Sequence, residues 1–407
     1  MRRVYLDDPL VEGATLARDI VGPGGDPIAR AGHRLAGRAL RALAERGATV
    51  CYVEDEAGAG VDAAPLPDHP AVEATRNALS ELCRVLARDL GPLQRHPTSR
   101  ALEEIKNARP LKTAAFALDG VRATAPALAG AARNVSGAAG LLFDRHPTDD
   151  LVGHSVHVAV IAGRLGAAIG FSENDLATTV FAALLHDLGL LAVPDEVRRT
   201  PEARRSPAEQ RRWEDHTLLG EMILGPASLR TPAVPIVAVE HHESQNGAGF
   251  PRGLTGGNRI LRAAEHAADR TRIALVSEVI ATADRYERLV APAVGTRPLS
   301  AAAARTVLTV EAGAVLNAEV VARMLDVIPA WPLGSEVRLH GGEHDGAHAV
   351  VTGFDARLPE RPAVRVFADA SRRPVEPVDL DLREAPALML EPVDLPSQAP
   401  GLAAGRA

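Results

Sequence analysis

Apolar residues recur at three- and four-residue spacing from Val72 to about Ile328, and this periodicity restricts the fold more than any other feature of the chain. One such stripe, which Gly91 ends, consists of Leu79, Leu82, Leu86 and Leu90. Because aromatic residues make up only 3% of the sequence, we expect a core of Ala, Leu and Val. The pattern predicts a mainly α protein built as a multi-helix bundle.

Both ends of the chain depart from this helical pattern. The first residues mix short extended runs with one helix, and after Pro332 the stretches EVRLH, HAVVTGF and PAVRVFAD alternate between apolar and polar positions. The segments that we expect are a small α+β module at 1–57, a Gly-, Ala- and Pro-rich linker at 58–71, a helical region leading into the core at 72–147, the main helical domain at 148–330, a short β-rich extension at 331–383 and a disordered tail at 384–407.

Composition disfavours several classes of function. The net charge of -7 argues against unspecific binding to a nucleic acid polymer or to an anionic membrane. The chain opens without the apolar stretch of a signal peptide, and no uncharged apolar run approaches the ~18 residues of a membrane span. Two cysteines, Cys51 and Cys83, are too few for a disulfide framework or a thiolate metal site. We therefore expect a soluble cytoplasmic protein.

Histidine and aspartate residues stand at the ends of several apolar helices. His186 and Asp187 end the run FAALLHDLG, and His241 and His242 end the run PIVAVEHHE. A carboxylate at the end of a buried helix requires a partner, because an uncompensated buried charge is very costly. A metal ion is one such partner. Adjacent histidines on one helix point about 100° apart, so the pair can contact two neighbouring ions or two sides of one.

Three further residues complete an ordered set over about 130 residues. His154 begins the helix HSVHVAVIAGRLG, His216 lies in WEDHTLLGEMIL, and Asp284 lies in VSEVIATADRYERL. Any one such histidine is more often a hydrogen-bonded core or cap residue than a ligand. The ordered set, each member on an expected helix, favours a metal site of iron, manganese or zinc. Water bridging two such ions is deprotonated near neutral pH and becomes a hydroxide nucleophile for a phosphodiester.

These stretches, from about 148 to 330, resemble the HD-GYP family of the HD metal-dependent phosphohydrolases. AALLHDLGLLAVPDEV resembles its HD motif, HHESQNGAGFPRGL its double-histidine helix and GYP loop, and VIATADRYERLV its metal-aspartate helix. The resemblance implies an HD/HD-GYP helical bundle that hydrolyses cyclic di-GMP to pGpG, to GMP or to both in bacterial second-messenger signalling. It also implies two or three divalent transition-metal ions, with iron ahead of manganese.

The resemblance also implies roles for single residues. The metal ligands it implies are His154, His186, Asp187, His216, His241, His242 and Asp284, with Asp150 as an added acidic ligand for a third ion. Asp187, with the bridging hydroxide, is the implied catalytic group. The implied substrate contacts are Gly249, Phe250 and Pro251, with Arg285, Arg288 and Arg297 as phosphate-binding candidates. Asp150 fits an N-terminal capping role about equally well, and each arginine fits an ordinary solvated role better. Trp213 is expected to be a packing residue.

The sequence departs from the family pattern around the substrate. The family's HDxGK lysine, expected to meet a substrate phosphate, is Leu190 here, which removes a charge-assisted bond worth about 1.5–3 kcal/mol. Asn246 replaces an aspartate, and Phe250 replaces the tyrosine of GYP. Three hypotheses stay open: a phosphodiesterase with reduced or shifted preference, an HD-GYP-like module that binds a nucleotide or a protein partner through the GFP loop without turnover, and a phosphohydrolase of another nucleotide. A homodimer fits the resemblance, although no heptad pattern requires one.

Overall fold

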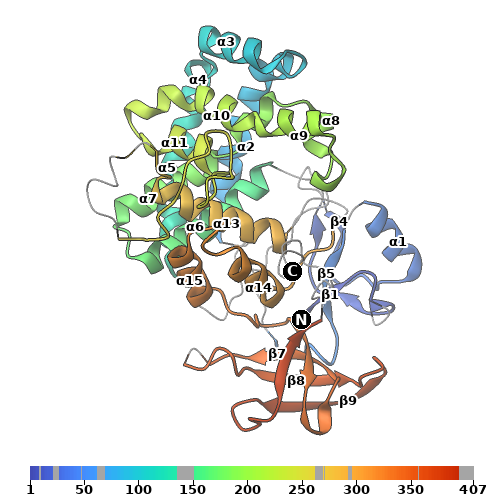
Figure 1. The fold of residues 1–407 in the computed structure, drawn as a ribbon. Helices are drawn as coiled ribbons and strands as arrows, with labels where there is room; N and C mark the ends of the chain where they lie inside the picture. Colours follow the sequence, from blue (N-terminus) through green and yellow to red (C-terminus); the bar gives the residue numbers. More distant parts are fainter. Residues whose placement is uncertain are drawn as a thin grey trace.

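The computed structural model describes residues 1–8, 11–21, 27–46, 48–61, 69–134, 151–261, 269, 271–291, 296–355 and 357–393. The protein is mainly helical, as the periodicity predicted, with a small module at one end of the chain and a sheet at the other (Figure 1). Strands β7, β8 and β9, orange to red in Figure 1, lie below the helices, and the blue N-terminal module lies above this sheet and beside the helices.

The N-terminal module is the predicted α+β unit. Its strands β1 (Arg2–Tyr5), β5 (Val50–Glu54) and β2 (Thr15–Leu16) form an antiparallel sheet in that order, and β3 (Ile20–Val21) pairs with β4 (Pro27–Ala29). Helix α1 (Gly37–Glu45) buries Leu43 against a small apolar core. The backbone N–H of Arg3 donates to the carbonyl of Gly334 at 3.0 Å, which joins this module to the C-terminal sheet.

The helical body follows the predicted stripes. Its elements, in chain order, are α2 (Pro70–Leu90), η3 (Gly91–Arg95), α3 (Thr98–Ala108), α4 (Pro110–Thr113), α5 (Ala115–Asn134), α6 (Leu151–Ile169), α7 (Glu173–Leu185), η4 (Leu188–Ala192), α8 (Asp195–Arg199), η5 (Glu202–Arg204), α9 (Pro207–Glu214), α10 (His216–Leu224), η6 (Gly225–Leu229), α11 (Ala233–Glu240), α13 (Leu275–Val290), α14 (Ala301–Glu311) and α15 (Ala318–Val327).

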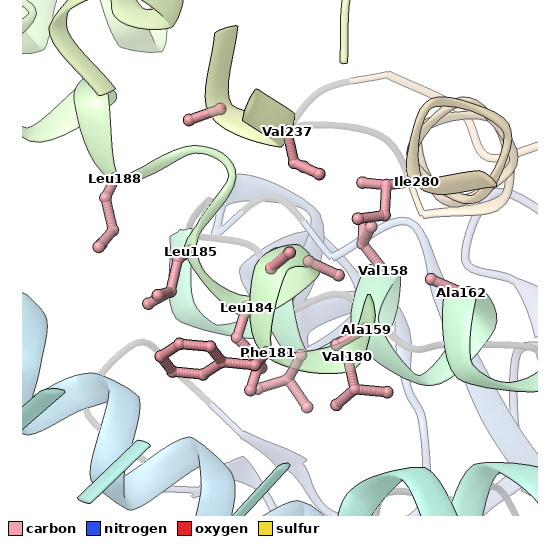
Figure 2. Packing of buried hydrophobic residues seen from close by; sticks show 14 of the residues in the cluster. Val158, Ala159, Ala162, Val180, Phe181, Leu184, Leu185, Leu188, Val237 and Ile280 are labelled. Carbon is pink, nitrogen blue, oxygen red and sulfur yellow. The ribbon is translucent and has the colours of Figure 1, made fainter. Parts of the chain in front are cut away.

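Helices α6 and α7 form the centre of the core. They pack together, and Val237 of α11 and Ile280 of α13 close over them (Figure 2). Both segments, Leu151–Ile169 and Glu173–Ala192, are long and apolar enough to cross a membrane by composition, but 78% and 83% of their apolar windows are buried inside the protein. Burial on nearly every side explains the high apolar content of both segments, because a helix surrounded by others needs no polar face.

The C-terminal sheet extends further than the sequence predicted. It is antiparallel throughout, in the order β10 (Met389–Pro392), β6 (Glu336–His340), β7 (His348–Gly353), β8 (Ala363–Ala368) and β9 (Pro374–Asp381), with a short η7 (Gly342–His344). Strand β10 lies in the segment that we had assigned to a disordered tail, and it pairs with β6 from Met389 opposite His340. The sequence did not predict β10 because the strand is only four residues long and lies in a proline-rich segment. Proline is tolerated there because β10 is an edge strand.

A glycine fixes the approach of the turn after α7 to helix α10. A Cβ on Gly189 would lie 1.9 Å from the carbonyl oxygen of His216 and 2.6 Å from the backbone nitrogen of Gly220. Neither atom can move without shifting α10, so only glycine fits. This contact brings the start of α10 directly against the segment that carries His186 and Asp187.

We expect Gly189→Ala to lower the free energy of unfolding by at least about 1–3 kcal/mol, because the added methyl group overpacks a backbone contact. The matched control is Gly120→Ala in α5, which meets nothing within 4 Å. Since alanine favours a helix interior by about 0.5–1 kcal/mol over glycine, this control should be neutral or stabilising. Urea denaturation of both variants checks the prediction, and equal effects would contradict it.

Candidate metal centre

The structure brings all seven predicted ligands into one buried cluster. His154 lies in α6, His186 and Asp187 follow the last residue of α7, His216 begins α10, His241 and His242 follow α11, and Asp284 lies in α13. Helix ends supply most of them, so each side chain leaves a rigid element close to where the elements converge. Their clustering agrees with the sequence analysis, and their role as ligands stays a prediction.

The donor atoms divide into two groups that share Asp187. We call Asp187, His216, His241 and His242 subsite A, and His154, His186 and Asp187, with Asp284 beside them, subsite B. In each group one nitrogen or oxygen atom per residue lies within 4.8 Å of the others, Asp284 excepted.

The carboxylate of Asp187 faces both groups. Its Oδ1 lies 3.2 Å from Nε2 of His216 and 3.4 Å from Nε2 of His241, while its Oδ2 lies 3.4 Å from Nε2 of His154 and 3.5 Å from Nε2 of His186. A carboxylate whose two oxygens address different sets of imidazoles is suited to bridge two cations.

Hydrogen bonds at the far ring nitrogen fix the orientation of four histidines. Nδ1 of His186, His216 and His241 lies 2.7, 2.7 and 3.0 Å from the carbonyl oxygens of Ala183, Trp213 and Val237. Nδ1 of His154 lies 2.8 Å from the carboxylate of Glu287. Because a carbonyl can only accept, Nδ1 of His186, His216 and His241 carries the proton, and the Nε2 lone pair of these three rings is directed at the cluster. This is the arrangement found around metal-binding imidazoles.

Several buried polar atoms fit a cation. Among the residues described, Nε2 of His186, Oδ1 of Asp187 and Nε2 of His242 are buried and form no hydrogen bond. Such atoms are costly unless they have a partner. Three or four imidazole and carboxylate donors directed at one point suit a divalent transition metal, so the residues present fit such an ion in each subsite.

The electrostatics differ between the subsites. Burial, aided by the neighbouring histidines, lowers the pKa of His241 to about 4 and holds that of His242 well below 6.5, so both are neutral at pH 7. Burial acts against protonation of His154 too, but Glu287 outweighs it and raises the pKa of His154 to about 10. Burial likewise opposes ionisation of Asp187 and Asp284, yet nearby histidines and Arg288 hold both pKa values well below the usual range.

Two residues beside the cluster were not assigned to the site from the sequence. Glu287 is fully buried and lies 2.8 Å from Nδ1 of His154 and 3.3 Å from Nδ1 of His157. His157 is buried beside it. A signal was present, because Glu287 follows Asp284 by three residues and therefore shares its face of α13.

The loop after α11 lies against subsite A. The ring of Phe250 stacks on that of His242, with centroids 4.8 Å apart, and Trp213 packs against the rings of His216 and His242 at 4.7 and 5.2 Å. A Cβ on Gly249 would lie 2.4 Å from the backbone nitrogen of Ser244, so the loop closes tightly only with glycine there. Phe250 and Gly249 are therefore near the cluster, as expected, and Pro251 follows them directly.

The three arginine candidates for phosphate binding lie in different surroundings. Arg288 lies on the carboxylates of the cluster. Arg285 instead binds Glu311 of α14, with Nε 2.9 Å from Oε2. Arg297 lies over the ring of Tyr5, 4.1 Å from its centroid, and 3.6 Å from Asp7 of the N-terminal module. Arg285 and Arg297 are thus engaged away from the cluster, and a substrate-binding role for either stays a prediction.

Two remaining sequence positions bear on the site. Leu190, at the position of the family's lysine, is 7% exposed and belongs to the apolar core, so no cation acts from there. Asp150, the candidate ligand for a third ion, lies outside the described residues.

Comparison with known proteins points to the same region. Residues 138–320 match a family model described as an HD domain. A cyclic di-GMP phosphodiesterase of Thermotoga maritima is 34% identical over 104 residues, which are 25% of this chain and 27% of that protein. A 3'3'-cGAMP-specific phosphodiesterase of Vibrio cholerae is 33% identical over 138 residues, 34% of this chain and 26% of that protein. The chain thus spans about a quarter of these curated relatives.

A solved HDG"Y"P protein from Bdellovibrio bacteriovorus is 14% identical, with 80% of this chain and 98% of that chain covered and a TM-score of 0.44. The fold and the matched region define the central part of this chain as an HD domain, a helical domain with a histidine and aspartate cluster. Within that class, the relatives named above are cyclic-dinucleotide phosphodiesterases, to which this part of the chain is similar.

We expect Glu287→Gln to weaken metal binding about 10- to 100-fold, because the amide no longer holds Nδ1 of His154 with a full negative charge. Metal content after dialysis against a graded chelator measures the change. Glu73→Gln, an exposed residue in the first turn of α2, is the matched control and should retain its metal. Equal metal content in the two variants would contradict the role assigned to Glu287.

Proposed function

We propose that this protein is a metal-dependent phosphodiesterase that hydrolyses cyclic di-GMP, to pGpG, GMP or both, in bacterial second-messenger signalling. The observation that carries the proposal is the carboxylate of Asp187 between two groups of buried imidazoles. The relatives named above as cyclic di-GMP and cGAMP phosphodiesterases support a cyclic dinucleotide as substrate.

The number of ions follows from the two subsites. Each offers enough donors for one divalent ion, so we propose two, with iron first and manganese second because mixed imidazole and carboxylate donors suit both. When bound, the ions supply the Lewis-acid charge and the activated nucleophile for phosphodiester hydrolysis. We keep the cytoplasm as the proposed location, since two cysteines do not provide a disulfide framework.

The protein itself orients the imidazole rings of the cluster. The carbonyl oxygens of Ala183, Trp213 and Val237 hold three imidazoles with Nε2 toward the cluster, so little reorganisation is needed on binding. Phe250 is half-buried and stays partly on the surface beside His242, where a guanine ring can stack on it. With Leu190 in the core, a phosphate of the substrate meets no lysine here, and Arg288 is the cation nearest to the carboxylates.

The decisive experiment combines metal analysis with hydrolysis of cyclic di-GMP under anaerobic conditions, with added iron(II) or manganese(II). We expect bound metal and turnover in the wild type. Asp187→Ala and His241→Ala should each reduce turnover on the order of 100-fold or more, because they remove groups placed in direct contact with the ion rather than around it. Glu73→Gln serves again as the exposed control.

The outcomes separate the hypotheses. Bound metal without hydrolysis of any cyclic dinucleotide would favour a binding module, and hydrolysis of another nucleotide alone would favour the broader phosphohydrolase class. A protein without bound metal would overturn the proposal.

Phe250→Ala should lower kcat/KM for cyclic di-GMP about 5- to 100-fold, as expected when one stacked base loses its aromatic partner at about 1–3 kcal/mol. Phe250→Tyr keeps the ring and is the matched control, with kcat/KM near that of the wild type. Metal content should stay unchanged in both variants. If alanine and tyrosine gave the same kcat/KM, Phe250 would not contact the substrate.

A further inference from the structure

Arg288 inserts a positive charge into one of the two subsites. It follows Asp284 by one helical turn of α13, and its Nε lies 2.9 Å from both carboxylate oxygens of Asp284. One of its terminal nitrogens lies 3.1 Å from Oδ2 of Asp187 and 3.4 Å from Nε2 of His154. These are the donor atoms of subsite B.

Subsite A is not covered in this way. Within the described part of the chain, Arg288 forms no hydrogen bond to His216, His241 or His242. It also leaves Oδ1 of Asp187, the oxygen that faces subsite A, without a hydrogen bond from any described residue. The two subsites therefore differ in charge before any ion binds.

The charge balance explains why a guanidinium is stable there. Asp187, Asp284 and Glu287 place three buried carboxylates around subsite B. Such a group is strongly destabilising without compensating cations. Arg288 supplies one positive charge in the protein itself, and its guanidinium contacts the carboxylates of both Asp284 and Asp187.

We propose that Arg288 is a built-in competitor of the second metal ion, so that subsite A fills first and subsite B fills only when the guanidinium withdraws from Asp187 and Asp284. The oxygen atoms that hold the guanidinium are those that a cation in subsite B needs, and a positive charge at this distance repels a divalent ion. This inference rests on the metal centre of the proposed function, but not on the identity of its substrate.

The surroundings of Arg288 allow such a withdrawal. Its side chain is 31% exposed, whereas those of Asp187 and Asp284 are 1% and 6% exposed, so the guanidinium is on the outer side of the cluster. Its central carbon lies 5.9 Å from the ring centroid of Trp213, an aromatic surface on which a displaced guanidinium can rest. Occupancy of subsite B then depends on the concentration of free metal, while subsite A stays filled.

The test is a titration of manganese(II) into the metal-free full-length protein, followed by calorimetry and by electron paramagnetic resonance of coupled ion pairs. We expect two separate binding steps in the wild type. Arg288→Met removes the charge and should tighten the second step about 10-fold or more while leaving the first unchanged. Arg285→Met, next to it on α13 but bound to Glu311, is the matched control and should titrate like the wild type.

Arg288→Met also removes the compensating charge, so its metal-free form should melt at a lower temperature and recover with manganese(II). If metal-free Arg288→Met does not stay folded, the titrations of the wild type and of Arg288→Lys still test the inference. The lysine keeps the positive charge, so its second binding step should remain weak. Two equal steps in the wild type, or an unchanged second step in Arg288→Met, would overturn the inference.

The readout is independent of catalysis. Sequential binding of two ions without hydrolysis of cyclic di-GMP would leave this inference intact and overturn the proposed function instead. Hydrolysis by a protein whose two ions bind with equal affinity would do the reverse. No manganese binding in any variant would overturn both.

Discussion

The structure of the site depends on one buried carboxylate, that of Asp187. At 1% exposure, a charge in this place is stable only if the surrounding groups compensate it. Imidazoles from four separate segments meet its two oxygens, and the ends of α7, α10 and α11 converge there for that reason. The glycine at position 189 lets α10 approach closely enough for His216 to take part. The convergence of these helix ends on Asp187 therefore produces both the tight helix packing and the candidate metal centre.

Helix α13 determines how the charge of the cluster is balanced. One face of this helix carries Asp284, Glu287 and Arg288 within five residues. Asp284 lies beside subsite B, Glu287 contacts His154, and Arg288 contacts Asp284. An error in the rotation of this helix would change all three contacts together.

The sequence predicted the helices and the clustering of the seven histidine and aspartate residues, because both depend on local information: apolar period for the helices, and residue type at helix ends for the cluster. The sequence did not predict contacts between side chains of distant segments. Spacing placed Glu287 near Asp284, but nothing local indicated that it would meet His154 across 133 positions. Arg297 and Arg288 looked equivalent in sequence, and only packing against Tyr5 separates them. Strand β10 was missed because its partner β6 supplies its stability.

The loop that carries Phe250 is tied to α13 through buried side chains. Nε2 of Gln245, in this loop, donates to Glu278 of α13 at 2.8 Å, and Nδ2 of Asn317, before α15, donates to the other oxygen of the same carboxylate at 2.9 Å. All three residues are buried, where a satisfied polar network specifies one arrangement and a broken one is costly. The loop, Asp284 and α15 therefore keep a fixed relation to one another. The ring of Phe250, stacked on His242, consequently has a defined position relative to the carboxylates of the cluster.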